Sequence, residues 1–158
     1  MRETLRRDDV VFMYPAKDKQ RYIDYAATFL AWGGAHNRKR VRELLEIGVH
    51  PTATIWCLTA GSHRLNESAD LRAATCVDIA GERIRVPWLC DHVTDGTPTW
   101  FGCTNNPTFR AHVRGTVADA MKGAAHGLHV DDHLGTSNTA ANFGGCFCDS
   151  CMDRFRRF

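Results

Sequence analysis

Short apolar segments alternate with amphipathic ones over much of the chain. Residues 26–32 form an apolar run closed by two glycines, which is typical of a strand buried on both faces. In residues 38–47 apolar side chains recur at helical spacing, which predicts an amphipathic helix with Asn37 as its N-cap. Residues 52–59 are rich in β-branched and aromatic side chains and predict a second strand. Together these segments predict one strand–helix–strand unit.

The chain continues with a long polar stretch, followed by another helix and another strand. Residues 62–99 are too long for a bare connection, and residues 83–89 within them have the composition of a strand. From Pro107 onward apolar side chains are spaced by four, which predicts a helix that ends near Gly123. Residues 127–130 then predict a strand that leads directly into two aspartates.

This alternation predicts an α/β fold with parallel strands, because a parallel crossover needs a helix to return the chain. Residues 1–25 are polar and basic and are interpreted as a lead-in segment, with the folded part in residues 26–158. Periodicity alone does not separate an open sheet from a closed barrel. A complete (β/α)8 TIM barrel needs about 250 residues, so on the barrel interpretation this chain supplies about the first four βα units.

The composition is that of a globular protein and excludes several classes of partner. Of the 158 residues, 44% are hydrophobic and 24% are charged, enough to bury the core of one domain. The formal net charge is +2 and the sequence has no basic stripe, so nucleic acid is not an expected partner. No apolar run approaches the roughly 18 residues that span a bilayer, and the start lacks the apolar region of a signal peptide. We therefore expect no membrane partner and a cytoplasmic location.

The seven cysteines are an odd number without a secretion signal, which favours metal binding or buried thiols over a disulfide framework. Cys146, Cys148 and Cys151 lie together after two glycines that let the backbone turn around an ion. This knuckle, residues 144–152, predicts a structural Zn²⁺ site that needs a fourth ligand. Cys103 is the preferred fourth ligand, because it precedes the second helix at the sheet end that the later loop must occupy. The alternative fourth ligands are His126, His129 and His133, and the alternative to a metal is three reduced thiols.

Two adjacent carboxylates, Asp131 and Asp132, follow the strand predicted at residues 127–130. In α/β sheets and barrels catalytic groups gather at the carboxyl ends of strands, so we predict that one of the two is a general acid or base. Successive strand residues point to opposite faces, so only one would face a substrate, and the alternation does not decide which. The alternative interpretation is a helix cap or a surface turn.

Aromatic and histidine side chains follow the first two predicted strands. Trp32 closes the first strand and Trp56 lies near the end of the second, while His36 and His63 stand in the loops that come next. Aromatic faces at strand ends suit sugar rings, which predicts a carbohydrate partner. The alternative interpretation is that both tryptophans belong to the core.

Two motifs in the second half of the chain resemble a known family. The segment CTNNPTFR at residues 103–110, followed by CFCDSC at residues 146–151 and then Phe155-Arg156, resembles the zinc-carrying part of the family 42 glycoside hydrolases, the bacterial β-galactosidases. The resemblance covers roughly residues 100–157. The family has Asn-Glu at the tip of its fourth strand, where this sequence has Asp131-Asp132.

The resemblance implies a (β/α)8 barrel that hydrolyses glycosidic bonds with retention of configuration. It implies that Asp132 is the acid/base and that Asp131, its neighbour in sequence, contacts the substrate. It also implies that zinc is bound by Cys103, Cys146, Cys148 and Cys151. The family's nucleophile lies on the seventh strand, so we expect this chain to be the N-terminal half of such a barrel. We expect it to be inactive alone and completed by the remaining half or by a homo-oligomer. The predicted substrate-binding residues are Trp32, His36, Trp56, His63, Asn105 and His133.

Two other functions fit the same residues. In the first, a non-catalytic module stabilised by zinc binds carbohydrate or protein, with Phe147 and the basic residues 154–157 presented to a partner. In the second, Asp131 and Asp132 form a catalytic metal site with nearby histidines. Neither needs a second carboxylate later in the sequence, whereas the glycosidase does.

Overall fold

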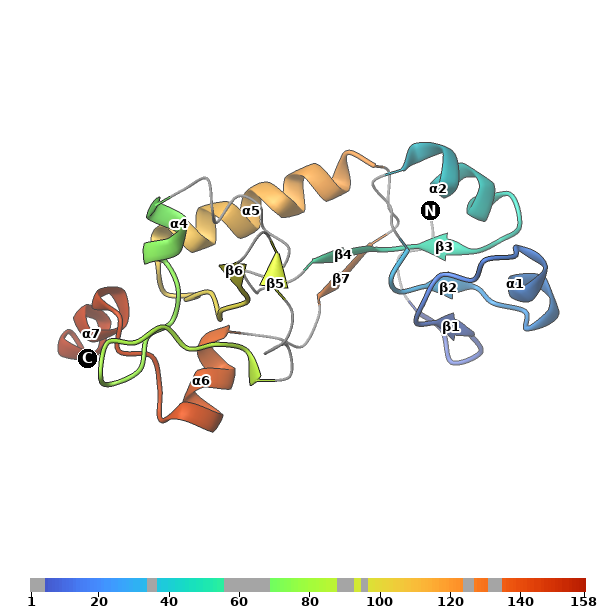
Figure 1. Ribbon diagram of the computed structural model, residues 1–158. Coiled ribbons are helices and arrows are strands. Elements are labelled where there is room, and N and C mark those ends of the chain that lie inside the picture. Colours follow the sequence, from blue (N-terminus) through green and yellow to red (C-terminus); the bar gives the residue numbers. More distant parts are fainter. Residues whose placement is uncertain are drawn as a thin grey trace. The chain divides into compact units, whose positions relative to one another are not determined.

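The computed structural model describes residues 5–33, 37–55, 69–87, 93–94, 97–123, 127–130 and 135–158 (Figure 1). The chain divides into two compact units. Unit 1 comprises residues 1–55 and 115–130, and unit 2 comprises residues 56–114 and 131–158. Helix α5 (Pro107–Met121) contributes its first turns to unit 2 and its last turns to unit 1.

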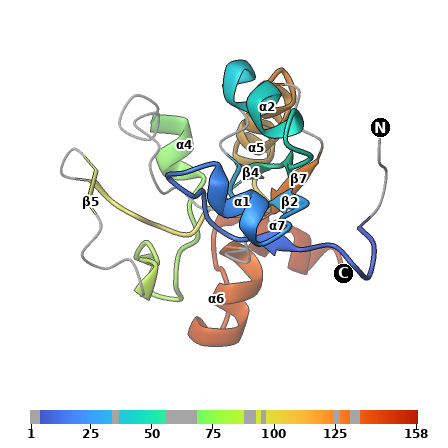
Figure 2. The ribbon, with the colours of Figure 1, turned by 90° about the vertical axis from the view of Figure 1, so that its right-hand side faces the viewer.

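Unit 1 is built on short parallel strands. Strands β1 (Val11–Phe12), β2 (Phe29–Leu30) and β3 (His50–Pro51) pair in chain order, and both pairings are parallel. Strand β4 (Ala53–Ile55) starts after a single intervening residue and pairs in parallel with β7 (Leu128–Val130). The views in Figures 1 and 2 both show β4 and β7 side by side. Parallel pairing, which the alternation of elements predicts, is confirmed for these strands.

Helix α2 (Arg38–Leu45) forms where the helical spacing predicts it. The side-chain oxygen of Asn37 accepts hydrogen bonds from the backbone amides of Lys39 and Arg40, at 3.0 and 3.2 Å, which confirms the N-cap. Gly48 follows the helix with a φ of 81°, the left-handed conformation that favours glycine. Both ends of the helix are therefore set by local sequence.

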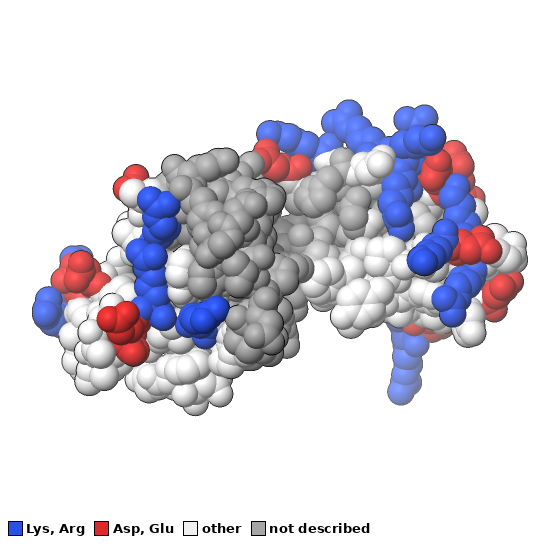
Figure 3. All heavy atoms as spheres, in the orientation of Figure 1, with Lys and Arg blue, Asp and Glu red and all other residues white. Residues whose placement is uncertain are grey.

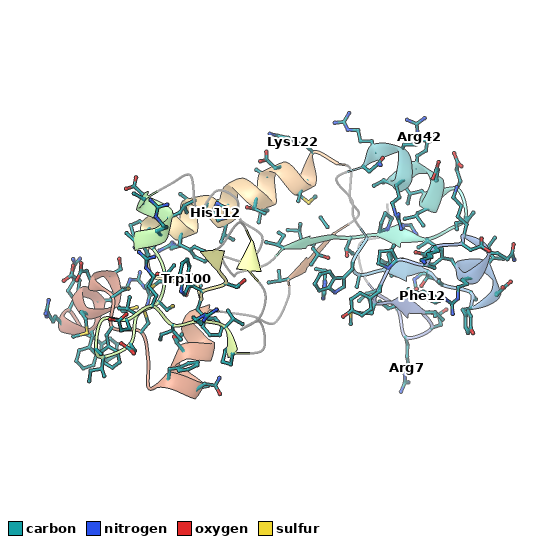
Figure 4. All side chains as sticks on the ribbon, viewed as in Figure 1. Arg7, Phe12, Arg42, Trp100, His112 and Lys122 are labelled. Carbon is teal, nitrogen blue, oxygen red and sulfur yellow. The ribbon has the colours of Figure 1, made fainter. Side chains whose placement is uncertain are left out.

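Two apolar clusters stabilise unit 1. Helix α1 (Gln20–Asp24) buries Tyr22 against Leu30, and the Tyr22 hydroxyl accepts a hydrogen bond from the Ala16 amide at 2.7 Å. The rings of Phe12 and Tyr22 have centroids 5.2 Å apart, and Phe12 is labelled in Figure 4. The second cluster joins α2, β4 and α5 through Val41, Ala53 and Ala120.

The end of α5 is bonded to the start of α2. The guanidinium of Arg38 donates two hydrogen bonds, 3.1 and 2.9 Å long, to the carbonyl oxygen of Lys122, the residue after the last of α5. Carbonyl groups at a helix C-terminus lack partners within the helix and carry partial negative charge, so a cation is favourable there. Figure 3 shows that Lys and Arg side chains gather over α2, and Figure 4 labels Arg42 and Lys122 on this part of unit 1.

Unit 2 contains short helices and isolated antiparallel bridges. Its further elements are α4 (Ala69–Ala73), β5 (Val93–Thr94), β6 (Thr97–Pro98), α6 (Gly135–Phe143) and α7 (Asp149–Arg156). Its bridges join Thr75 to Gly102, Val77 to Arg83 and Arg85 to Trp100. The strand predicted at residues 83–89 is thus represented by two bridged residues, and its last two residues lie outside the described part. None of the helices described is long and apolar enough to cross a bilayer.

Candidate metal centre

Two cysteines of unit 2 lie on one face of a pair of antiparallel segments. The amide of Cys76 donates to the Phe101 carbonyl at 2.7 Å, and the amide of Cys103 donates to the Ala74 carbonyl at 2.9 Å. These bonds lie on either side of the bridge between Thr75 and Gly102. The side chains of Cys76 and Cys103 therefore lie on the same face of the paired segments, opposite to the side chain of Thr75. Both cysteines are fully buried, in one apolar cluster with Ile84, Val86 and Phe101.

The start of α5 fixes the position of Cys103. The side-chain oxygen of Asn106 accepts hydrogen bonds from the amides of Thr108 and Phe109, at 2.9 and 3.4 Å, and Pro107 occupies the first helical position. A Cβ at Gly102 would lie 1.9 Å from the Phe109 ring, so only glycine leaves room for that ring. The predicted position of Cys103, just before the second helix, is confirmed.

Three further cysteines of the described part lie on the knuckle, residues 144–152, which joins α6 to α7. Gly144 and Gly145 have φ of 73° and 132°, and the Gly145 amide donates to the Thr139 carbonyl of α6 at 3.0 Å. These glycines turn the chain away from the end of α6. The amide of Phe147 then donates to the carbonyl of Val77 at 2.9 Å, which attaches the knuckle to the segment that carries Cys76.

Four sulfur atoms converge where these segments meet. The Sγ atoms of Cys103, Cys146, Cys148 and Cys151 all lie within 4.8 Å of one another. The Sγ of Cys103 lies 3.4 Å from that of Cys148 and 3.5 Å from that of Cys151. With Zn–S bonds of about 2.3 Å, the sulfurs of a tetrahedral site are about 3.8 Å apart, so small shifts would seat an ion here. The predicted gathering of these four cysteines is confirmed, and the group could bind a metal ion.

The donor set fits zinc by its chemistry. Four thiols without a carboxylate suit zinc rather than a hard cation such as magnesium or calcium, and four protein ligands leave no open position for water. The first and last ligands are 48 residues apart in sequence. An ion held by all four would therefore join distant segments of unit 2.

Contacts among the thiols spread their pKa values widely. Hydrogen bonds from Cys146, Cys148 and Cys76 lower the pKa of Cys103. Contact with Cys103 raises the pKa of Cys146, but hydrogen bonds from Cys148 and Cys76 outweigh it and lower that pKa to about 6. Burial raises the pKa of Cys151 to about 11, against the hydrogen bond from Asn105. Hydrogen bonding to Cys103 and Cys146 raises the pKa of Cys148. These shifts favour ionisation of Cys103 and Cys146 over that of Cys148 and Cys151.

Asn105 supports the centre from outside the ligand set. Its side-chain amide donates to the Sγ of Cys151 at 3.3 Å, and its side-chain oxygen accepts from the guanidinium of Arg154 at 3.1 Å. Such outer contacts orient ligands and tune the ion they hold. The sequence predicts Asn105 as a substrate-binding residue, and the structure places it beside Cys151.

The remaining predicted site residues are distributed as follows. Trp32 is in unit 1, where its ring lies 5.7 Å from Tyr14 and 5.9 Å from His129, centroid to centroid. His129, an alternative zinc ligand from the sequence, belongs to β7 and is not part of the sulfur group. The predicted site residues that lie outside the described part are His36, Trp56, His63, Asp131, Asp132 and His133, and the alternative ligand His126 lies there too.

The sequence gives Cys76 no role beyond its place among the seven cysteines. In the structure it shares an apolar cluster with Cys103, against which Cys146 packs, and these two thiols raise the pKa of Cys76. No spacing motif includes it, because its nearest partner in the cluster is 27 residues away and is reached only through backbone pairing. The only available signal was the surplus of cysteines over four.

Comparisons of this chain with protein-family models, with curated proteins and with solved structures find no match.

Proposed function

We propose that this chain carries a structural zinc centre and is part of a retaining glycoside hydrolase of the (β/α)8 type. The observation that carries the zinc centre is the convergence of Cys103 with the knuckle sulfurs within 4.8 Å. When bound, zinc supplies a cross-link between the segments of unit 2. The chain's own residues supply the ligands, the apolar surroundings and the hydrogen bond from Asn105.

The order of the strands in unit 1 supports the barrel. β1, β2 and β3 are neighbours in chain order, and β4, which follows β3 after one residue, pairs with β7. In a (β/α)8 barrel each strand pairs with the next one along the chain, whereas a doubly wound sheet reverses its order at a switch point. On this assignment β7 is the fourth barrel strand, and Asp131 and Asp132 follow it in sequence.

The proposed mechanism gives the two aspartates different tasks. Asp132 protonates the oxygen of the leaving group and later takes a proton from water, and Asp131 hydrogen-bonds the sugar. Retaining hydrolysis also needs a nucleophilic carboxylate about 5 Å away on the other side of the bond. Adjacent residues cannot flank one bond in this way, so the nucleophile must come from another segment. Trp32 offers an aromatic face for the sugar ring.

The zinc centre is tested by metal analysis of the purified protein. We expect one zinc per chain, retained after dialysis without a chelator and lost in the Cys103→Ala variant. A protein that folds without any bound metal, and takes up none when zinc is supplied, would contradict this part of the proposal.

The catalytic part is tested in the full polypeptide that carries these residues. For Asp132→Asn we expect slow hydrolysis of alkyl β-galactosides but little change in kcat/KM with 2,4-dinitrophenyl β-galactoside, because that leaving group needs no proton. The kcat for this substrate should still fall, because water then lacks its general base, and added azide should restore it and give a β-galactosyl azide. Asp131→Asn should slow both substrates alike. Failure of the unsubstituted polypeptide to hydrolyse any aryl glycoside would leave the zinc centre but reject the glycosidase.

One observation favours the non-catalytic alternative. Phe155 on α7 is 78% exposed and stands between Arg154 and Arg156, in the basic segment that this alternative presents to a partner. On that alternative, Phe155→Ala would abolish binding of a partner, whereas Asp132→Asn would leave every measured property unchanged.

A further inference from the structure

A fifth cysteine lies at the edge of the proposed zinc centre. Cys76 is fully buried, and Val77, the next residue, accepts the backbone hydrogen bond from Phe147, the residue after Cys146. The same apolar cluster contains Cys76 and Cys103, and the knuckle cysteines pack against it. Cys76 is not one of the four whose sulfur atoms lie within 4.8 Å of one another. The centre therefore has one more thiol than a tetrahedral zinc site uses.

Two of the possible sets of four thiols differ only in one member. Cys103, Cys148 and Cys151 are common to both sets, and the fourth member is either Cys146 or Cys76. The set with Cys76 takes two sulfurs from paired backbone segments and two from the C-x-x-C spacing at the start of α7. Two pairs of cysteines, one pair spaced C-x-x-C, are a common zinc arrangement. The set with Cys76 therefore also provides the four thiolates that a tetrahedral zinc site needs.

Cys146 is the ligand best suited to leave. It follows two glycines with positive φ, where the backbone can change direction at low steric cost. The three knuckle cysteines are partly exposed, whereas Cys76 and Cys103 are fully buried on paired segments. The backbone bond from Phe147 to Val77 places the residue after Cys146 against the residue after Cys76. Replacement of Cys146 by Cys76 therefore needs the least rearrangement.

We propose that the zinc centre exchanges one ligand, with Cys76 replacing Cys146. This inference rests on the zinc centre proposed above. In the exchange the Zn–S bond to Cys146 breaks and a Zn–S bond to Cys76 forms. The proton of the Cys76 thiol passes to the departing Cys146 thiolate, so the charge of the centre is unchanged and no oxidant is needed. The consequence is that zinc keeps four sulfur ligands when the partly exposed Cys146 is alkylated or oxidised.

Cobalt substitution tests the exchange, because the near-ultraviolet charge-transfer absorption of Co²⁺ thiolates scales with the number of Co–S bonds. We expect Cys146→Ala and Cys76→Ala each to keep the full absorption per bound cobalt. The double variant should lose about a quarter of it, since three ligands remain of four. Its zinc affinity should fall at least about tenfold below that of Cys146→Ala. Cys148→Ala is the matched control, and it should lose a quarter of the absorption by itself. Equal losses in Cys146→Ala and Cys148→Ala would overturn the proposal.

The unsubstituted protein gives a test that does not depend on variants folding. With ¹¹³Cd in the centre, scalar couplings identify the cysteines whose β-protons are joined to the metal through sulfur. We expect couplings to Cys103, Cys148 and Cys151, and to both Cys146 and Cys76. Couplings to Cys146 with none to Cys76 would overturn the exchange but leave the metal centre in place. Absence of any bound cadmium or zinc would reject the centre itself.

Discussion

The backbone amide of Phe147 donates to the carbonyl oxygen of Val77 over 2.9 Å, and this bond attaches the cysteine knuckle to the segment that follows Cys76. Its partners are 70 residues apart in sequence, so the bond can form only when these two distant segments of unit 2 lie together. Zinc bound by Cys103 and the knuckle cysteines would hold distant segments of unit 2 together in the same way.

Chelation of the metal should therefore expose the Phe147 amide. Structural zinc contributes about 10–16 kcal/mol of binding free energy in small zinc modules, so we expect protection of this amide to fall by at least about a hundredfold. Hydrogen exchange measured by NMR before and after a chelator checks this. The amide of Thr52, which donates to the Leu30 carbonyl in unit 1 at 2.9 Å, is the control and should keep its protection. Unchanged exchange at Phe147 after complete metal removal would contradict a structural function of zinc.

Replacement of Asn105 should weaken the metal centre without removing a ligand. Asn105→Ala deletes the hydrogen bond to Cys151 and leaves Arg154 without its acceptor. Loss of an outer partner typically lowers metal affinity about 10- to 100-fold, and we expect a decrease in this range in a competition titration with a chromogenic chelator.

Asn106→Ala is the matched control for this effect. It deletes the cap of α5, which costs about 1 kcal/mol of stability, but it touches no sulfur. Its zinc affinity should stay within about twofold of the unsubstituted protein, well short of the loss of an outer partner. If both variants lose affinity equally, the contact between Asn105 and Cys151 does not tune the centre.

Gly102 should tolerate no side chain. A Cβ there would lie 1.9 Å from the Phe109 ring, so Gly102→Ala forces the start of α5 away from Cys103. Overpacking of this severity costs about 3 kcal/mol or more, which a urea titration measures as a lower midpoint. Gly115→Ala, with nothing within 4 Å, is the control, and it should stabilise α5 by about 1 kcal/mol. Equal midpoints for the two variants would reject the packing of Phe109 on Gly102.

Zinc binding should release fewer protons than four ordinary thiols would. The pKa of Cys103 is lowered by its thiol neighbours and that of Cys146 falls to about 6, so both are thiolates at neutral pH. The pKa of Cys148 is raised and that of Cys151 rises to about 11, so both must still lose a proton. We expect release of about two protons per zinc near pH 7.5, with affinity rising about a hundredfold per pH unit. Calorimetry in buffers of different ionisation enthalpy measures the number, and release of four protons would contradict the prediction.

The local sequence was sufficient for several elements. The amphipathic spacing and Asn37 predict α2 and its N-cap, because the side chain that caps the helix is adjacent to it in sequence. Pro107 and the four-residue spacing predict α5 in the same way. The C-x-C-x-x-C pattern identifies three members of the sulfur group that could bind a metal ion, since sulfurs on one knuckle depend only on short-range geometry. In these cases the interacting groups lie within a few residues of each other.

Cys103 and Cys76 show where the sequence alone was insufficient. Cys103 could be preferred as fourth ligand over three histidines only by its position before a helix, and its approach to Cys148 depends on backbone pairing across unit 2. Cys76 belongs to no spacing motif, because its amide is bonded to the carbonyl of Phe101, 25 residues away, and that pairing brings it to the side of Cys103. The sequence by itself determined the helix ends and the chemistry of the knuckle, since both depend on neighbouring residues. Only the tertiary structure decided which distant thiols meet the knuckle, because long-range pairing depends on how the whole unit packs.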